Sequence, residues 1–356
     1  MRHATDDLRI RDIKQVIAPR ELHEQFPMTD AIANTVYHTR QAIQRILQFD
    51  DSRLLVVVGP CSVHDPIAAL EYGQRLLAVR NELDEQLLIV MRVYFEKPRT
   101  TVGWKGLIND PDLDNSFAIN KGLGMARRLL LDLNALGMPA GTEFLDLMSP
   151  QYIADLVSWG AIGARTTESQ GHRELASGLS CPIGFKNATD GSVKVAIDAI
   201  HSATRPHVFM SQTKEGRTAI FSTSGNSDTH IILRGGQRPN YDTESVKIAT
   251  DEIIKAGLIP KMMIDVSHAN SRKQPENQLR VCSDVASQIA RGNTQIIGAM
   301  IESHLVGGRQ NCALGEELIY GQSITDACVG WEETVPMLHE LAEAVIRRRQ
   351  GGRRTF

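Results

Sequence analysis

Short apolar runs recur along this chain and alternate with segments in which apolar residues return every three or four positions. The runs are rich in Val, Ile and Leu, which is typical of strands buried on both faces of a parallel sheet. The intervening periodicities predict amphipathic helices, among them 242–256, 278–290 and the face formed by Leu123, Ala126, Leu129, Leu130 and Leu133. The predicted strands are 53–58, 87–95, 138–143, 160–164, 182–186, 231–233, 261–266 and 295–301.

This alternation predicts an α/β fold, and eight strand–helix units in roughly 300 residues favour a (β/α)8 TIM barrel. A doubly wound open sheet is the alternative.

Two segments fall outside the repeat. Residues 1–45 precede the first strand and have a helical pattern, so we expect an N-terminal extension for assembly or regulation, followed by a catalytic barrel over 46–350. At about 206–228, strand-like runs at 208–211 and 219–222 flank a glycine turn and predict an inserted β-hairpin.

Composition narrows the class of protein. The 356 residues are 42% hydrophobic, enough for one large core or two smaller ones, and a net charge of −3 gives no electrostatic reason to expect binding to nucleic acid or an anionic membrane. No apolar run reaches the length of about 18 residues that spans a bilayer, and residues 1–12 lack the apolar centre of a secretory signal. Five irregularly spaced cysteines do not form a disulfide framework, so we expect a cytoplasmic protein.

Basic residues stand at the ends of the predicted strands, where a (β/α)8 barrel places its active site. Lysine and arginine are costly to bury without an anionic partner, and arginine binds phosphate and carboxylate groups in a bidentate manner. The pattern therefore predicts a small polyanionic substrate with two phosphates and a carboxylate; the alternative is a set of surface salt bridges. The basic residues are Arg92, Lys97, Arg99, Arg165, Lys186 and Arg234.

A second group at the strand ends has the donors of a transition-metal site. Its members are Cys61, His268, Glu302 and Asp326. Sulfur, imidazole and carboxylate ligands suit a divalent transition metal. No spacing motif supports this assignment, because only the predicted barrel brings the four residues together. The alternative is that Cys61 packs as a small buried residue and His268 is a hydrogen-bonded core histidine.

Several long motifs, in order, resemble one family. The chain resembles the 3-deoxy-D-arabino-heptulosonate-7-phosphate (DAHP) synthases, of the microbial class with an N-terminal extension and an inserted hairpin. The resemblance runs from about residue 6 to about residue 344. The motifs are Gly59-Pro60-Cys61-Ser62, the segment 97–106 beginning Lys97-Pro98-Arg99-Thr100, the segment 163–170 around Arg165, Gly184-Phe185-Lys186-Asn187, Ile232-Leu233-Arg234-Gly235-Gly236, Ser267-His268-Ala269-Asn270 and the segment 323–328 around Asp326.

The resemblance implies a reaction and its ligands. Phosphoenolpyruvate and D-erythrose 4-phosphate condense to DAHP and phosphate, the first step of the shikimate pathway. A divalent ion (Mn, Fe, Co or Zn) is implied on Cys61, His268, Glu302 and Asp326. Contacts with phosphoenolpyruvate are implied for Arg92, Lys97, Glu143, Ala164, Arg165, Lys186 and Arg234, and contacts with the sugar phosphate for Arg99 and Thr100. Related enzymes are commonly homotetramers built from dimers.

The chemistry of the residues suggests roles within this reaction. Lys97, placed between both substrates, is the expected general acid for the new alkoxide. The base that activates water stays open between Glu143 and Asp326. Cys328 lies two residues past Asp326, so one hypothesis is that Cys61 and Cys328 oxidise when the metal is absent, and the other is that Cys328 only packs.

The resemblance also implies feedback inhibition by one aromatic amino acid. Asp6 and Asp7 are candidates for holding its ammonium group, and Phe209 and Phe221 for lining an aromatic pocket, unless they only pack the hairpin. Serine at Ser211, where tyrosine-sensitive relatives tend to have glycine, favours phenylalanine as the effector, whereas Phe221 is larger than expected. The implied positions are Asp6, Asp7, Pro150, Gln151, Leu175, Leu179, Ser180, Phe209, Ser211 and Phe221.

Three other functions compete with this one. The first is 3-deoxy-D-manno-octulosonate-8-phosphate synthase, which uses arabinose 5-phosphate and has an asparagine-containing segment where this chain has Lys97-Pro98-Arg99-Thr100. The second is a metal-dependent aldolase, which would not need so many cations. The third is a catalytically inactive amino-acid sensor on the same fold, which the complete set of candidate catalytic residues disfavours.

Overall fold

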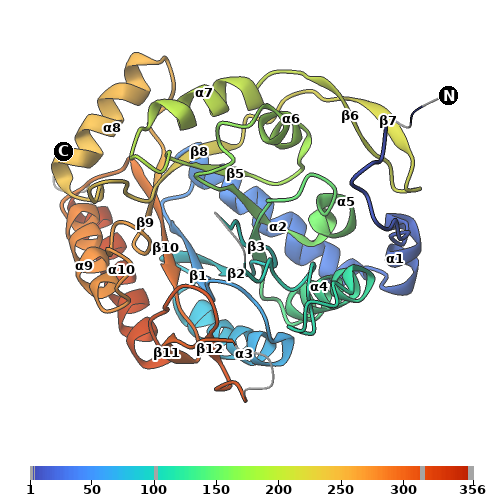
Figure 1. Cartoon of the computed structure of the whole chain (residues 1–356). Helices are drawn as coiled ribbons and strands as arrows, with labels where there is room; N and C mark the ends of the chain where they lie inside the picture. Colours follow the sequence, from blue (N-terminus) through green and yellow to red (C-terminus); the bar gives the residue numbers. More distant parts are fainter. Residues whose placement is uncertain (1–2, 4, 100–102, 313–316, 352–356) are drawn as a thin grey trace.

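The computed structural model describes residues 3, 5–99, 103–312 and 317–351. In this part of the chain, eight parallel strands close into a barrel (Figure 1). The barrel order is β1-β2-β3-β4-β5-β8-β9-β10, and pairs such as Leu55↔Gly298 close β10 onto β1. The strands are β1 (Leu54–Gly59), β2 (Leu87–Arg92), β3 (Ala140–Glu143), β4 (Trp159–Ile162), β5 (Ile183–Lys186), β8 (Thr229–Leu233), β9 (Met262–Asp265) and β10 (Ile296–Glu302). The predicted barrel is confirmed, and the open sheet is wrong.

Helices surround the barrel and follow most of its strands (Figure 1). Two of these helices have an aspartate as the capping residue at the N-terminus. Asp65 accepts hydrogen bonds from the backbone N–H groups of Ile67 and Ala68, and Asp242 accepts from Glu244 and Ser245, which satisfies donors that a helix start leaves unpaired. The helices are α3 (Pro66–Glu82), α4 (Ile119–Ala135), α5 (Pro150–Ile153), the 3-10 turn η1 (Ala154–Leu156), α6 (Gln170–Gly178), α7 (Lys194–Ala203), α8 (Thr243–Lys255), α9 (Asn277–Ala290) and α10 (Trp331–Gly351). Among the described residues, no helix is long and apolar enough to cross a membrane.

The predicted second strand is longer than the observed one. The apolar run continues to Phe95, but β2 ends at Arg92, where its pairing with β3 also ends at Arg92↔Gly141. Val93, Tyr94 and Phe95 stay buried without extending the ladder. An apolar run indicates burial, but it does not indicate where pairing with the neighbouring strand ends.

The barrel has two apolar layers, because successive strand residues point to opposite faces of the sheet. In β1, Leu54, Val56 and Val58 pack with the surrounding helices. Its alternate residues, Leu55 and Val57, pack inside the barrel with Ile43, Ile46 and Leu47 of α2 (Asp30–Leu47). The last turns of α2 therefore cover the end of the barrel at which the strands begin, and in Figure 1 this helix lies across the strands.

The N-terminal extension is only partly helical. Helix α1 (Pro19–Gln25) and helix α2 agree with the prediction, but residues 5–18 are not helical, so the prediction was wrong there. Side chains of helices α4 and α5 hold the end of this stretch instead. Asn120 Oδ1 accepts from the Ile17 N–H at 2.9 Å, and the Tyr152 hydroxyl donates to the Ile17 carbonyl at 2.8 Å. Partners outside the segment therefore hold its last residues, and a local pattern cannot report such partners.

The predicted hairpin is confirmed as β6 (Val208–Gln212) paired antiparallel with β7 (Thr218–Ser222). Its turn contains Gly216 at φ +77°, a conformation that glycine adopts without steric cost. Two further strands, β11 (Val306–Arg309) and β12 (Gln322–Ser323), were not predicted. They are short, and β11 contains two glycines and is mostly exposed, so it lacks the apolar run by which the other strands were found.

Candidate active site

A charged cavity of about 300 Å³ opens at the ends of the barrel strands. Its walls bring together residues that are up to 229 positions apart in the sequence, from Lys97 to Asp326. They come from the segment after β2, the end of β3, the loop after β4, the end of β5, and the loops after β8, β9 and β12. The predicted residues that line it are Lys97, Arg99, Glu143, Ala164, Arg165, Lys186, Arg234, His268 and Asp326. Thr100, the other predicted sugar-phosphate contact, lies outside the described residues.

Positive charge dominates the lining of the cavity. Lys97 and Lys186 are 9% and 3% exposed, so their ammonium groups are held where few waters reach them. Lys273 lines the cavity as well and was not among the predicted residues. Its position in the loop that follows β9 is the signal that would have found it, because the other cations also follow strands. The surplus of cations over the carboxylates Glu143 and Asp326 suits a ligand with several negative charges.

Arg92 is the one predicted cation that does not line the cavity. It is fully buried, and its guanidinium lies 3.6 Å from the centre of the Tyr94 ring. It donates to Glu302 Oε1 at 2.9 Å and to the carbonyl oxygens of Pro60 at 3.0 Å and Cys61 at 3.2 Å. Arg92 therefore holds the turn after β1 against the end of β10, and its contact with a substrate stays a prediction.

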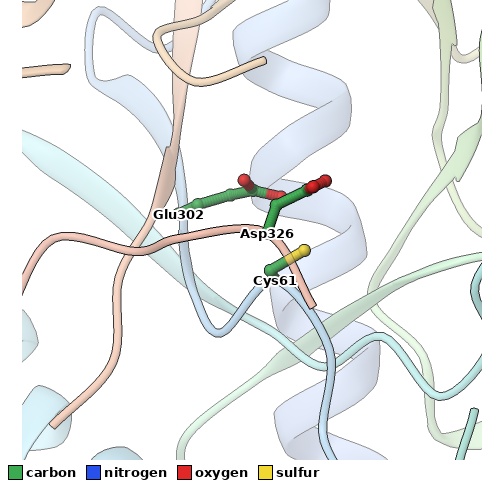
Figure 2. A group of neighbouring side chains, drawn as sticks. All are labelled: Cys61, Glu302 and Asp326. Carbon is green, nitrogen blue, oxygen red and sulfur yellow. The ribbon is translucent and has the colours of Figure 1, made fainter. Parts of the chain in front are cut away.

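Three of the four predicted metal ligands form one cluster. One potential ligand atom from each of Cys61, Glu302 and Asp326 lies within 4.8 Å of the other two (Figure 2). They come from the turn after β1, the last residue of β10 and the loop after β12. Gly59 permits the turn to approach β2, because a side chain there would place its Cβ only 2.7 Å from the Arg92 carbonyl oxygen.

His268 stands beside this cluster, and it is outside the group of mutually close ligand atoms. Its Nε2 is 3.7 Å from Glu302 Oε1, and its Nδ1 is 2.8 Å from Asp265 Oδ2. Nδ1 also contacts the Ser267 hydroxyl at 2.8 Å, which itself donates to Asp265, and metal-binding histidines typically have such carboxylate support at their second ring nitrogen. The donors therefore fit a divalent transition metal. Asp265 was missed, although a lone carboxylate at the end of an apolar strand is a visible signal.

The charges of the cluster are balanced by two basic side chains. Lys97 Nζ is 3.1 Å from Cys61 Sγ, and Arg92 contacts Glu302. Burial opposes ionisation of Glu302, but His268 and Arg92 outweigh it and hold the pKa of this carboxyl below its usual value. Burial likewise lowers the pKa of Lys97, but the neighbouring Cys61 and Glu302 outweigh it and raise the pKa overall, so the amine is protonated at neutral pH.

The Cys61 thiol differs from its acidic neighbours. Burial raises its pKa, and the nearby Glu302 charge raises it further. Coordination to a metal needs the thiolate, so binding there releases a proton. Cys328 lies next to it, since the Cys61 N–H donates to Cys328 Sγ at 3.4 Å and both residues are fully buried. The pair is adjacent, as the oxidation hypothesis requires, and its oxidation stays a hypothesis.

A second cavity, of about 750 Å³, lies between α5, α6 and the hairpin. The Phe209 and Phe221 rings stack in its wall with centroids 6.2 Å apart. Asp6 and Asp7, the predicted partners for an ammonium group, are exposed and do not line it. The predicted effector residues that do line it are Pro150, Gln151, Leu175, Leu179, Ser180, Phe209, Ser211 and Phe221.

Comparisons with known proteins agree with this geometry. The model of the DAHP synthetase I family matches residues 31–339. An Escherichia coli protein named phospho-2-dehydro-3-deoxyheptonate aldolase, Phe-sensitive, is 63% identical over 98% of this chain and 100% of its own. A Trp-sensitive aldolase of the same name from Enterobacter agglomerans is 54% identical over 97% of this chain and 99% of its own. A solved phospho-2-dehydro-3-deoxyheptonate aldolase from Francisella tularensis superposes with a TM-score of 0.94 at 54% identity, over 96% of this chain and 99% of that one.

Proposed function

The chain belongs to the DAHP synthetase I family, and we propose that its charged cavity binds phosphoenolpyruvate and D-erythrose 4-phosphate and condenses them to DAHP and phosphate. The observation that carries the proposal is the convergence of basic side chains on one cavity beside a cluster of metal-type donors. Two phosphates and a carboxylate need several cations, and a simple aldolase substrate does not. Holding both substrates in attack geometry supplies a large part of the rate enhancement.

The cations divide between the two substrates by position. Lys186, Arg165 and Arg234 come from neighbouring strands β5, β4 and β8, so they form one side of the cavity and are assigned to phosphoenolpyruvate. Arg99 is assigned to the phosphate of the sugar, with Thr100 beside it in sequence. The backbone N–H of Lys97 donates to the Lys105 carbonyl at 2.9 Å, which closes the segment that carries Arg99.

Cys61, His268, Glu302 and Asp326 would hold a divalent ion (Mn, Fe, Co or Zn) at the edge of this cavity. When bound, the ion polarises the aldehyde oxygen of the sugar as a Lewis acid. The sulfur, nitrogen and oxygen donors suit a transition metal better than magnesium or calcium, which prefer oxygen ligands alone.

Lys97 is assigned as the general acid. Its ammonium group lies between the cluster and the cavity, and its raised pKa keeps it protonated until the new alkoxide forms. Water then adds to the former enol carbon, and the resulting hemiketal phosphate releases phosphate. Glu143 and Asp326 are the carboxylates that border the cavity among the described residues, and the proposal assigns the water-activating base to one of them.

The test is phosphate release from phosphoenolpyruvate plus erythrose 4-phosphate, with and without a chelator. Turnover that stops with chelator and returns with added metal supports the proposal. Lys97→Met is expected to lower kcat by at least about a hundredfold. Lys247→Met, on the exposed face of α8, is the matched control and is expected to change nothing. Turnover only with arabinose 5-phosphate would identify the protein as a 3-deoxy-D-manno-octulosonate-8-phosphate synthase instead. No turnover with either sugar would favour the catalytically inactive amino-acid sensor.

For regulation, we propose that the 750 Å³ cavity binds an aromatic amino acid, with phenylalanine as the effector. The stacked Phe209 and Phe221 provide an aromatic wall, and the relative with 63% identity has Phe-sensitive in its name. Ser180→Phe is expected to fill the cavity and relieve inhibition at unchanged turnover. Ser287→Phe, at an exposed position of α9, is the matched control. Unchanged inhibition of Ser180→Phe would place the effector elsewhere.

For assembly, we propose a homo-oligomer, as expected for a homotetramer built from dimers. The outer face of the hairpin leaves Val208, Met210 and Ile220 68%, 78% and 76% exposed, and a soluble monomer rarely exposes such a contiguous apolar patch. A second copy that covers this face explains the exposure. Ile220→Lys is expected to lower the mass measured by sedimentation, whereas Ile254→Lys, at an exposed position of α8, is expected to leave it unchanged.

A further inference from the structure

One buried carboxylate contacts both halves of the candidate active site. Asp265 is the last residue of β9 and is 0% exposed. Its Oδ2 lies 2.8 Å from Nδ1 of His268 and 3.2 Å from Nζ of Lys186. Its Oδ1 accepts hydrogen bonds from the Ser267 N–H at 3.0 Å and the Ser267 hydroxyl at 2.5 Å. A single side chain thus joins a candidate metal ligand to a candidate phosphoenolpyruvate cation.

We propose that Asp265 is a positioning residue that couples metal binding to phosphoenolpyruvate binding, so that each ligand increases affinity for the other. The inference rests on the proposed function and adds a regulatory link within its site. Asp265 does not line the cavity, and it therefore acts through His268 and Lys186 without touching the substrate itself.

Toward the metal, Asp265 selects the orientation of the His268 ring. The Ser267 hydroxyl donates to Asp265 Oδ1 and therefore accepts from the Nδ1–H of His268 at 2.8 Å, and the negative charge of Asp265 Oδ2, 2.8 Å from Nδ1, favours the same tautomer. This leaves the lone pair of Nε2 directed to the side of Glu302. His268 has φ +52°, an unfavourable conformation for a residue with a side chain. The contacts with Asp265 and Ser267 help to hold the ring in place despite this backbone strain.

Toward the substrate, Asp265 compensates the charge of Lys186. The Lys186 ammonium is 3% exposed, and burial of an unpaired charge is costly. Asp265 therefore keeps the cation in the cavity wall before a substrate arrives. The same ion pair competes with the substrate, because Lys186 must share its positive charge between Asp265 and the incoming anion.

The sign of the coupling follows from this competition. Coordination at Nε2 makes the Nδ1–H of His268 a stronger donor, which draws the charge of Asp265 toward the imidazole and away from Lys186. Lys186 is then more available to an anionic substrate. By thermodynamic reciprocity, bound phosphoenolpyruvate must raise metal affinity by the same factor.

A purely structural role fits the surroundings less well. Strand β9 is already held by backbone pairing on both sides, with Leu233↔Ile264 on β8 and Met300↔Asp265 on β10. The strand does not need a carboxylate for these bonds. A buried charge at this place is a cost to folding unless its partners have a use for it.

The experiment compares the full-length wild type with Asp265→Asn, which preserves side-chain shape and removes the charge. Metal affinity is measured by competition between Co²⁺ and a chelator, with and without phosphoenolpyruvate. Phosphoenolpyruvate affinity is measured by calorimetry on metal-free and Co²⁺-loaded protein. We expect the wild type to show coupling of about 5-fold or more, equal in both directions. Asp265→Asn is expected to bind Co²⁺ about 10- to 100-fold more weakly and to lose most of the coupling.

Wild-type affinities and coupling in Asp265→Asn would overturn the inference, as would reduced stability with both affinities unchanged. If Asp265→Asn does not fold, Ser267→Ala decides. It removes the hydroxyl that donates to Asp265 and contacts His268 Nδ1, and it keeps the charge of Asp265, so a smaller loss of coupling supports the inference and an unchanged value refutes it. Asp242→Asn, at the start of α8, is the control for loss of an ordinary carboxylate. If the wild type neither binds phosphoenolpyruvate nor releases phosphate, the proposed function has failed instead.

Discussion

Arg92→Met tests whether the positive charge of Arg92 and that of a bound metal ion can both compensate the buried Glu302 carboxylate beneath the active site. Methionine fills much of the space of the arginine stem but removes a fully buried charge. Glu302 Oε1 then loses a donor at 2.9 Å, and the carbonyls of Pro60 and Cys61 lose donors at 3.0 and 3.2 Å. Removing one partner of a buried ion pair typically costs about 3–5 kcal/mol, because the other charge is left uncompensated.

This cost can be expressed as a melting temperature. For 356 residues, an unfolding entropy of about 2.1 cal/mol/K per residue gives roughly 0.75 kcal/mol/K. A loss of 3–5 kcal/mol then lowers the Tm of the metal-free protein by about 4–7 °C. A bound divalent ion supplies positive charge to Glu302, so the loss is expected to be smaller by about 2 kcal/mol in the metal-loaded protein, where only the carbonyls remain unpaired.

Scanning calorimetry in chelator and in excess metal measures both values. The double variant Arg92→Met/Glu302→Gln is expected to recover part of the metal-free loss, because it removes the stranded charge as well. Arg128→Met breaks an exposed pair with Asp132 and is expected to cost less than about 1 kcal/mol. An equal loss with and without metal would refute the argument, since it would show that the charge of Arg92 and that of the metal are not interchangeable at Glu302.

Three further outcomes are expected. Burial, with the nearby Asp146 charge adding to it, raises the pKa of Glu96 to about 7 against a usual value of 4.5, so the stabilisation from the protonated carboxyl is fully present below pH 4.5 and is lost as the pH rises through 7. Glu96→Gln should flatten the fall of Tm between about pH 5 and 8.5, and a parallel fall in the variant would assign the effect to other groups. Gly163→Ala would place a Cβ 2.3 Å from Glu143 Oε1, so the carboxylate must move. Steady-state kinetics should then show at least about a tenfold loss in kcat/KM at an unchanged Tm, and unchanged kinetics would remove Glu143 from the mechanism. Ile46→Ala at the base of the barrel should cost about 2–5 kcal/mol by calorimetry with KM unchanged, and a negligible cost would mean that α2 does not close the barrel.

Local sequence rules were sufficient for the barrel and for most of the cavity. A strand buried on both faces reads as an unbroken apolar run, and a charged residue directly after such a run lies at the rim of the barrel. These rules located Lys186 at the end of β5 and Glu302 at the end of β10 from strand position alone. The hairpin was found in the same way, because its glycine turn is also a local signal.

By itself, then, the sequence determined which side chains stand at the rim, since that depends only on where each strand ends. The tertiary structure decided which of them meet. Arg92 was predicted as a cavity cation, yet it is held beneath the cavity by its contact with Glu302 on β10, the strand on the other side of β1. Asp265 joins His268 to Lys186 because β9 and β5 flank β8 in the barrel, and Ile17, at the end of the non-helical stretch, is held by Asn120 and Tyr152. Such contacts depend on closure of the barrel and on the packing of distant segments, and no local pattern of polar and apolar residues encodes them.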